Sequence, residues 1–370
     1  MTTSLPPPRR GSKAGGRVVH PAGEPLESDG AASSRLRTPY PLLAPPSAVT
    51  GVEWPAIPSP ISARVLSLLL QMGQSEWWPR ETVEADQLLQ LSALLRHTRD
   101  TVPFYRERLR NVGLDPERAL TWEHWRELPI LTRSDLQEHF EQIKSTAVPA
   151  GHGRLWLARS SGSTGRPVSV LKTDLTRLLW RAFTLRDHFW HGRDLQGRLA
   201  AIRYVASGGG APPQGSVAPS WDTLLGEVVR TGPAYLLQVQ ADVREQANWL
   251  RRIAPDYLVT YPSNLVALLR HFREEGLERP SLRDVTTLAE TLPEEARPLC
   301  REVWGVEVRD IYSTVECGYL ALQCPEQEET WPKGTVGCTW MASRADGRRP
   351  LSKIPAASIR AAPSPVSSAG

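Results

Sequence analysis

The stretch YLVTYPSNLVALLRHFREEGLERPSLRDVTTLAETLPEEARPLCREVWGVEVRDIY, residues 257–312, decides the fold class. Short apolar runs alternate in it with longer runs that have helical periodicity. The pattern predicts strands and helices in turn: Tyr257–Tyr261, Ser263–Glu275, Val285–Ala289, Pro293–Trp304 and Val306–Tyr312. Such alternation is typical of an α/β domain with a largely parallel sheet.

The alternation extends toward the amino terminus. Leu199–Val205 reads as a strand and Ala241–Ile253 as a helix. Apolar residues at helical spacing predict another helix from Glu84 onward, and Thr132 to Asp135 have the pattern of a capping box. We expect Asp174 to cap a helix that runs to His188.

The two ends of the chain have a different composition. Residues 1–60 are rich in Pro, Gly, Ser and Arg, which predicts a disordered segment, and Val52 is a candidate for the true start. Residues 327–370 lack helix or strand periodicity, and no aromatic residue follows position 341. We interpret them as an irregular tail produced by a frameshift. The large domain is therefore expected at residues 61–326.

Composition excludes several classes of protein. The 370 residues carry a net charge of +4, and no block of like charge indicates a nucleic-acid partner. No run approaches the ~20 apolar residues of a membrane span, and the amino terminus has no signal-peptide core. The four cysteines form no C-x-x-C pair, which favours reduced thiols. We expect a cytoplasmic protein.

A second stretch, RSSGSTGRPV at residues 159–168, indicates a binding loop. Strand-like residues flank it on both sides. Glycines allow the backbone to approach an anion, and consecutive N–H groups and hydroxyls are suitable phosphate donors. The pattern is not the Walker motif, so the residues alone fit either a phosphate loop or a plain turn. The candidate phosphate-binding residues are Ser160, Ser161, Gly162, Ser163, Thr164 and Gly165.

This loop resembles the phosphate loop of the adenylate-forming (AMP-dependent synthetase and ligase) superfamily. It is most similar to phenylacetate–CoA ligase and its capsular-polysaccharide-biosynthesis (CapK-type) relatives. Further stretches resemble the same family in the same order: Thr101–Arg108, Leu128–Leu136, Thr260–Ser263, Leu288–Pro293, Asp310–Gly318 and Ala321–Pro325. The resemblance covers residues 52–326 and implies the large α/β domain of such an enzyme.

The resemblance implies an ATP-dependent ligase that joins a small carboxylate to AMP. The acyl group then passes to CoA, a carrier protein or another acceptor. The implied catalytic and metal residue is Glu316, which would bind Mg²⁺. The implied nucleotide residues, besides the loop, are Ala289, Glu290, Asp310, Tyr312, Ser313 and Thr314. Those implied to border the carboxylate are Tyr261, Pro262 and Ser263.

The sequence departs from the family pattern in two places. The family's Y-G-[ST]-T-E is replaced by YSTVE at residues 312–316. After residue 326 the family's ribose-binding aspartate and its lysine-bearing small domain are not recognisable, so we expect impaired adenylation. Two alternatives remain: a non-catalytic nucleotide-binding remnant that needs a partner, and a phosphate loop in an unrelated fold.

Overall fold

The computed structural model describes residues 45–160, 167–205, 208–323 and 325. The predicted amino-terminal segment lies largely outside these ranges, and the predicted tail lies wholly outside them. The domain boundaries therefore remain predictions.

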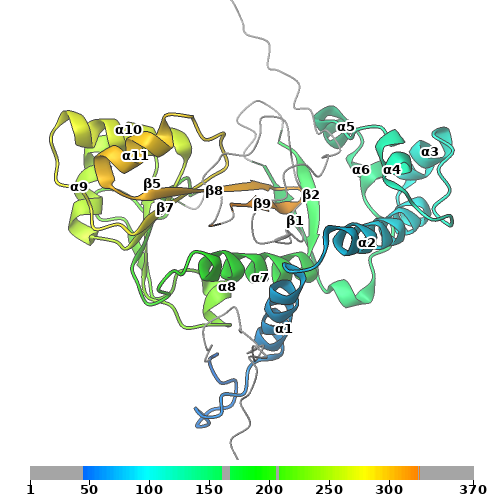
Figure 1. Ribbon diagram of the computed structural model, residues 1–370, viewed down its shortest axis with the longest axis horizontal. Helices are drawn as coiled ribbons and strands as arrows, with labels where there is room; N and C mark the ends of the chain where they lie inside the picture. The colour runs from blue at the N-terminus through cyan, green and yellow to red at the C-terminus, as the bar shows by residue number, and fades with distance from the viewer. Residues whose placement is uncertain (1–44, 161–166, 206–207, 324, 326–370) are drawn as a thin grey trace, which may run out of the picture. The chain divides into compact units, whose positions relative to one another are not determined.

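Helices form the first part of the described chain (Figure 1). Thr132 and Asp135 make the predicted capping box at the start of α5, because each side chain accepts a hydrogen bond from the other residue's backbone N–H. An ion pair of 3.4 Å between Arg108 and Asp135 joins α3 to the same helix. The helices are α1 (Pro60–Ser75), α2 (Arg80–Thr101), α3 (Pro103–Asn111), α4 (Trp122–Glu127), α5 (Arg133–Glu138), α6 (Phe140–Ile143) and the 3₁₀ turn η1 (Ala150–His152).

An antiparallel hairpin follows, made of β1 (Leu155–Arg159) and β2 (Ser169–Thr173). It leads directly into α7 (Asp174–Trp190). The prediction that Asp174 caps this helix is wrong. The side chain of Thr173 caps it, while the Asp174 carboxylate accepts the backbone N–H of Arg154 at 2.9 Å.

The other strands of the described residues form one seven-stranded sheet with the order β4-β5-β3-β6-β7-β8-β9. The five inner strands are parallel, and the outer strands β4 and β9 are antiparallel to their neighbours. The α/β class with a mostly parallel sheet is therefore confirmed. The strands are β3 (Leu199–Arg203), β4 (Ser216–Ala218), β5 (Ala234–Gln238), β6 (Tyr257–Thr260), β7 (Asp284–Leu288), β8 (Glu307–Thr314) and β9 (Gly318–Leu322).

Helices connect these strands. They are α8 (Thr223–Gly226), α9 (Val243–Ile253), α10 (Pro262–Glu274) and α11 (Ala296–Trp304). α10 begins at Pro262, one residue before the predicted start, and the missing N–H of a proline costs no helical hydrogen bond at this position. Pro293 does not open α11; its carbonyl accepts the N–H of Ala296, at which the helix begins.

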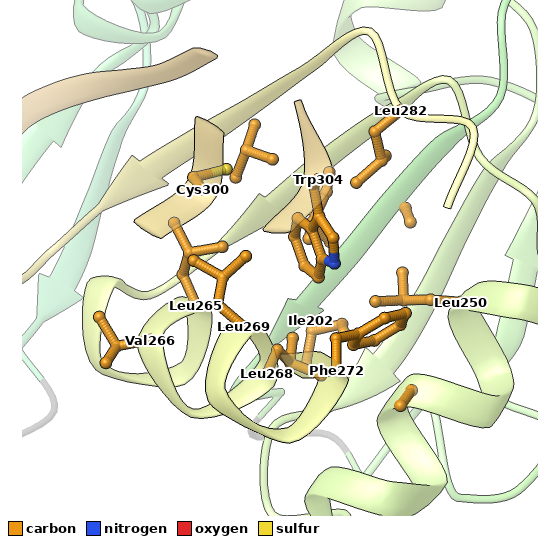
Figure 2. Packing of buried hydrophobic residues seen from close by; sticks show 14 of the residues in the cluster. Ile202, Leu250, Leu265, Val266, Leu268, Leu269, Phe272, Leu282, Cys300 and Trp304 are labelled. Carbon is orange, nitrogen blue, oxygen red and sulfur yellow. The ribbon is translucent and has the colours of Figure 1, made fainter. Parts of the chain in front are cut away.

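The larger hydrophobic core lies between the sheet and helices α9, α10 and α11. Figure 2 shows Leu265, Leu269 and Phe272 of α10 beside Trp304 of α11. The rings of Phe272 and Trp304 meet edge to face at 5.3 Å, and both side chains are buried. Burying apolar surface contributes about 25 cal/mol per Å², so this layer stabilises the packing of the helices on the sheet.

A second core cluster packs α7 against α1 and the sheet edge. Leu69 of α1, Leu185 of α7 and Leu322 of β9 belong to it. Arg186 and Trp190 of α7 both donate hydrogen bonds to Glu76, which directly follows α1. No helix of the described residues has both the length and the apolar character needed to cross a bilayer.

Candidate functional site at the carboxyl edge of the sheet

The parallel strands β6, β7 and β8 lie side by side in the sheet. Thr260 of β6 is paired with Thr287 of β7, which is paired with Asp310 of β8. In open α/β sheets, the crevice outside the carboxyl ends of the strands is the usual ligand site. This register brings the residues implied to bind the nucleotide and those implied to border the carboxylate to the same edge of the sheet.

A direct hydrogen bond joins the segments that follow β6 and β7. The backbone N–H of Ser263, in the first turn of α10, donates to Glu290 Oε2 at 3.0 Å. The hydroxyl of Tyr261, just before that helix, accepts the backbone N–H of Tyr204 at 3.2 Å. The substrate-side and adenine-side residues expected from the sequence are therefore neighbours.

Ala289 has an unusual backbone conformation. Its φ of 69° lies in the left-handed region, which costs a residue with a Cβ about 1–2 kcal/mol. Strain of this kind persists only where the surrounding structure enforces it, and it is common at binding sites. The geometry turns the chain sharply at the end of β7.

Asp310 is held by an extensive hydrogen-bond network. Its Oδ1 accepts the Thr287 hydroxyl at 2.8 Å, and its backbone N–H donates to Gln323 Oε1 at 3.0 Å. Arg297 Nη2 donates to the same Gln323 oxygen at 2.9 Å. Burial raises the pKa of Asp310, while the Thr287 hydroxyl and the charge of Arg297 act in the opposite direction. The hydrogen bond from the Thr287 hydroxyl holds the carboxyl group in place at this edge of the sheet.

The end of β8 carries the rest of the predicted motif. Tyr312 is 38% exposed, and the register with β9 shifts between Tyr312 and Ser313. The hydroxyl of Thr314 accepts the backbone N–H of Cys317 at 3.1 Å, which closes the turn into β9. Glu316 lies exposed in this turn.

The surroundings of Glu316 include a residue that the sequence did not single out. Burial lowers the pKa of Lys172 on β2, and the nearby Cys317 and Glu316 act to raise it. Tyr105 of α3 also lies within electrostatic range of Cys317, and burial raises the pKa of that tyrosine. Lys172 and Tyr105 therefore both interact electrostatically with the β8–β9 turn. Lysine is rare in this chain, and Lys172 lies shortly after the Ser/Gly loop.

The ends of that loop are closed by two hydrogen bonds. The Ser160 N–H donates to the carbonyl of Val168 at 2.9 Å, and the Val168 N–H donates to Ser160 Oγ at 2.8 Å. Of the six candidate phosphate residues, only Ser160 is described. Ser161, Gly162, Ser163, Thr164 and Gly165 lie outside the described residues.

The donor set at Glu316 fits Mg²⁺ only together with a substrate. Within the described ranges, no group of three or more His, Cys, Asp or Glu side chains is positioned to hold a metal ion. Mg²⁺ prefers octahedral oxygen coordination and usually takes one or two carboxylates, with phosphate oxygens and water as its other ligands. Glu316 would supply one carboxylate of that kind.

A pocket opens near Tyr261, at the carboxyl ends of β3 and β5. Its volume is about 350 Å³. It is lined by Tyr204, Ala211, Pro212, Gln238, Gln240 and Ala241. Its lining combines apolar side chains with the amides of Gln238 and Gln240.

Comparison with curated proteins gives a consistent result. Phenylacetate-coenzyme A ligase of Pseudomonas putida is 26% identical over 260 residues, which are 68% of this chain and 56% of the relative. The chain is similar in sequence to phenylacetate-coenzyme A ligases. The enzymes of that name from Thermus thermophilus and Escherichia coli are 27% and 26% identical over 67% of this chain. The resemblance predicted from the motifs is confirmed for these ligases.

The similarity covers only part of the relatives, and the structural similarity is low. The chain spans about half the length of the curated relatives it matches, and no family model matches it. An open conformation of 2-hydroxyisobutyryl-CoA ligase in complex with 2-HIB-AMP and CoA superposes with a TM-score of 0.49. It is 19% identical and covers 65% of this chain and 56% of the solved one.

Proposed function

We propose that the carboxyl edge of the seven-stranded sheet binds ATP and a small carboxylate and joins them. A carboxylate oxygen attacks the α-phosphorus, the bond between the α- and β-phosphates breaks, and pyrophosphate leaves with the displaced electron pair. The product is an acyl-adenylate. The observation that carries this proposal is the alignment of Thr260, Thr287 and Asp310 across three parallel strands, with the Ser263–Glu290 hydrogen bond beside it.

In this proposal each site residue has a physical role. Asp310 accepts the adenine amino group, Tyr312 stacks on the ring, and the backbone at Ala289 and Glu290 lies along its edge. Ser313 and Thr314 lie beside the nucleotide. Glu316 binds Mg²⁺, which would neutralise charge on the phosphates. The loop of residues 160–165 grips the outer phosphates. Tyr261, Pro262 and Ser263 border the carboxylate.

The relatives support a proposal for the acyl acceptor. Phenylacetate-coenzyme A ligases carry the acceptor in their name, so we propose CoA as the acceptor here, with a carrier protein as the alternative. We further propose that residues 61–326 form the catalytic domain, that residues 1–60 and 327–370 lie outside it, and that the protein works in the cytoplasm, where ATP and CoA are available.

Two measurements on the full chain test this function. Equilibrium binding reports the affinity for MgATP, and carboxylate-dependent exchange of radiolabelled pyrophosphate into ATP reports adenylation. We expect both, with phenylacetate among the acids that promote exchange and with a rate of exchange reduced by the departures from the family pattern. Binding without exchange for any acid in a broad panel would assign nucleotide binding without catalysis. Absence of both would refute the proposal. Asp310→Asn, which replaces one acceptor oxygen with a donor, should weaken binding, whereas Asp115→Asn on an exposed turn should not.

A further inference from the structure

Gln323 lies where the pairing of the outer strand β9 with β8 ends. The pairing stops at Ile311 and Leu322, so Asp310 and Gln323 are the next residues beyond it. The backbone N–H of Asp310 donates to the side-chain oxygen of Gln323 at 3.0 Å. A side chain therefore continues the connection between these two segments at the residue that carries the candidate adenine acceptor.

The Gln323 oxygen is itself held by a buried cation. Arg297 Nη2, on α11, donates to this oxygen at 2.9 Å, and Arg297 Nη1 donates to the carbonyl of Val308 on β8. Gln323 is 4% exposed and Arg297 is 8% exposed, so water does not readily replace either partner. The rigid guanidinium fork thus ties Gln323 to β8 two residues before Asp310.

The carboxylate of Asp310 is held from the neighbouring strand on the other side of β8. The hydroxyl of Thr287, on β7, donates to Asp310 Oδ1 at 2.8 Å. Thr287 therefore restrains the carboxylate, and Gln323 restrains the backbone that carries it. Hydrogen bonds weaken steeply when their geometry is lost, so an acceptor that is no longer held binds its ligand less well.

We propose that Gln323 is a positioning residue for the base of the nucleotide. By holding the backbone of Asp310, it sets the preference of the site for a purine with an amino group over a purine with an oxo group at the same position. This inference rests on the proposed function, in which Asp310 accepts the adenine amino group. An oxo group cannot donate to a carboxylate, so its binding gains nothing from the placement of Asp310. Gln323 itself does not touch the nucleotide.

The first test compares the Kd of MgATP with that of magnesium inosine triphosphate, whose base carries the oxo group. Q323L removes the acceptor oxygen, and Q323N moves it back by one methylene while keeping a polar amide in the buried site. Both variants of the full chain should raise the Kd for MgATP roughly 2- to 12-fold, the worth of one ordinary hydrogen bond, and change that for inosine triphosphate by less than about twofold.

The matched control is Q246L. Gln246 is also buried, and its side chain donates to the backbone carbonyls of Val239 and Ala241 at 3.1 and 2.8 Å. Losing these bonds should lower stability but leave the ratio of the two Kd values unchanged. The control therefore separates the loss of a buried glutamine in general from the loss of Gln323.

The second test asks whether Gln323 acts through Asp310. D310A removes the acceptor and should by itself abolish the preference for MgATP. Q323L added to D310A should then leave the ratio of the two Kd values unchanged, whereas Q323L alone lowers the preference. R297K keeps the charge but replaces the guanidinium fork with a single nitrogen, so it should also lower the preference.

The outcomes separate this inference from the function on which it rests. If the unmodified protein binds neither nucleotide, shows no preference, or keeps its preference in D310A, the proposed role of Asp310 fails and the inference fails with it. If D310A abolishes a preference that Q323L and Q323N retain, the role of Gln323 is refuted while the function stands. Equal losses for both nucleotides in these variants would mean that Gln323 only supports the fold, and a further change of the ratio in the double variant would mean that it acts by another route. Either result overturns the proposal.

Discussion

Replacing Arg193 by methionine should destabilise the protein more than any surface change. Arg193 follows α7 and joins that helix to β7, the strand that leads to the candidate adenine turn. Its Nη1 lies 2.5 Å from Asp187, its Nε 3.1 Å from Asp284, and its Nη2 donates to Thr286 at 3.0 Å. The three charged side chains are at most 10% exposed.

The size of the effect follows from this burial. Methionine fills a similar volume but leaves two carboxylates without their cation in a site that water hardly reaches. Breaking a buried ion pair by removing one partner costs about 3–5 kcal/mol, and here one arginine serves both acids. We therefore expect the free energy of unfolding to fall by at least about 3 kcal/mol, a large part of the 5–15 kcal/mol typical of a domain.

Urea denaturation followed by tryptophan fluorescence measures this loss. Arg283→Met is the matched control, because Arg283 also pairs with two aspartates, Asp194 and Asp256, but is 56% exposed. Exposed pairs contribute about 0–1 kcal/mol. Neutralising the orphaned acids, with Asp187→Asn and Asp284→Asn added to Arg193→Met, should recover part of the stability. Equal losses for the variants at 193 and 283 would refute the reasoning.

Three further predictions follow from the same structure. Burial, aided by the charge of Arg193, lowers the pKa of His188 to about 3. Below pH 6.5 the unfolded chain therefore binds more protons than the folded chain. Stability should fall by up to ~1.4 kcal/mol per pH unit between pH 6.5 and 3, and His188→Gln should flatten that slope in urea titrations. Thr287→Val removes the hydrogen bond from the Thr287 hydroxyl to Asp310 and should lower the free energy of unfolding, measured by urea denaturation, by about 1.5–3 kcal/mol. The double variant Thr287→Val with Asp310→Asn should lose less stability than the sum of the two single variants. Burial raises the pKa of the Cys300 thiol to about 12, so iodoacetamide should label Cys300 in urea but not in the native protein, and rapid native labelling would contradict the packing of α11.

Most of the parallel part of the sheet was predictable because short apolar runs alternate there with runs of helical periodicity. That pattern located β3, β6, β7 and β8 to within about two residues. It did not locate β4, β5 or β9. β4 and β9 are outer strands whose pairing depends on segments elsewhere in the chain, and β4 has only three residues. Local periodicity carries no information on such pairing.

Helix ends were harder to predict than helix existence. Thr173 and Asp174 are both good N-cap residues, so the sequence cannot choose between them. The backbone N–H of Arg154 donates a hydrogen bond to the Asp174 carboxylate, and the Thr173 hydroxyl accepts the N–H of Thr176 and caps the helix. That contact spans the hairpin and exists only in the folded protein.

The candidate site was partly predictable for a simple geometric reason. The carboxyl ends of parallel strands meet at one edge, so residues after β6, after β7 and on β8 were expected to be neighbours, and the Ser263–Glu290 hydrogen bond joins two of these segments. Lys172 was not predictable in this way, since the hairpin does not belong to the large sheet. The electrostatic interaction between Lys172 and Glu316 arises only in the folded protein.

The central claim is that adenine binds at the ends of β7 and β8. A crystal structure of the full chain with ATP tests it most directly. The account predicts the adenine ring against Tyr312, with its amino group within about 3 Å of the Asp310 carboxylate. Adenine density elsewhere on the protein, with Asp310 and Tyr312 unchanged and free of ligand, would contradict it.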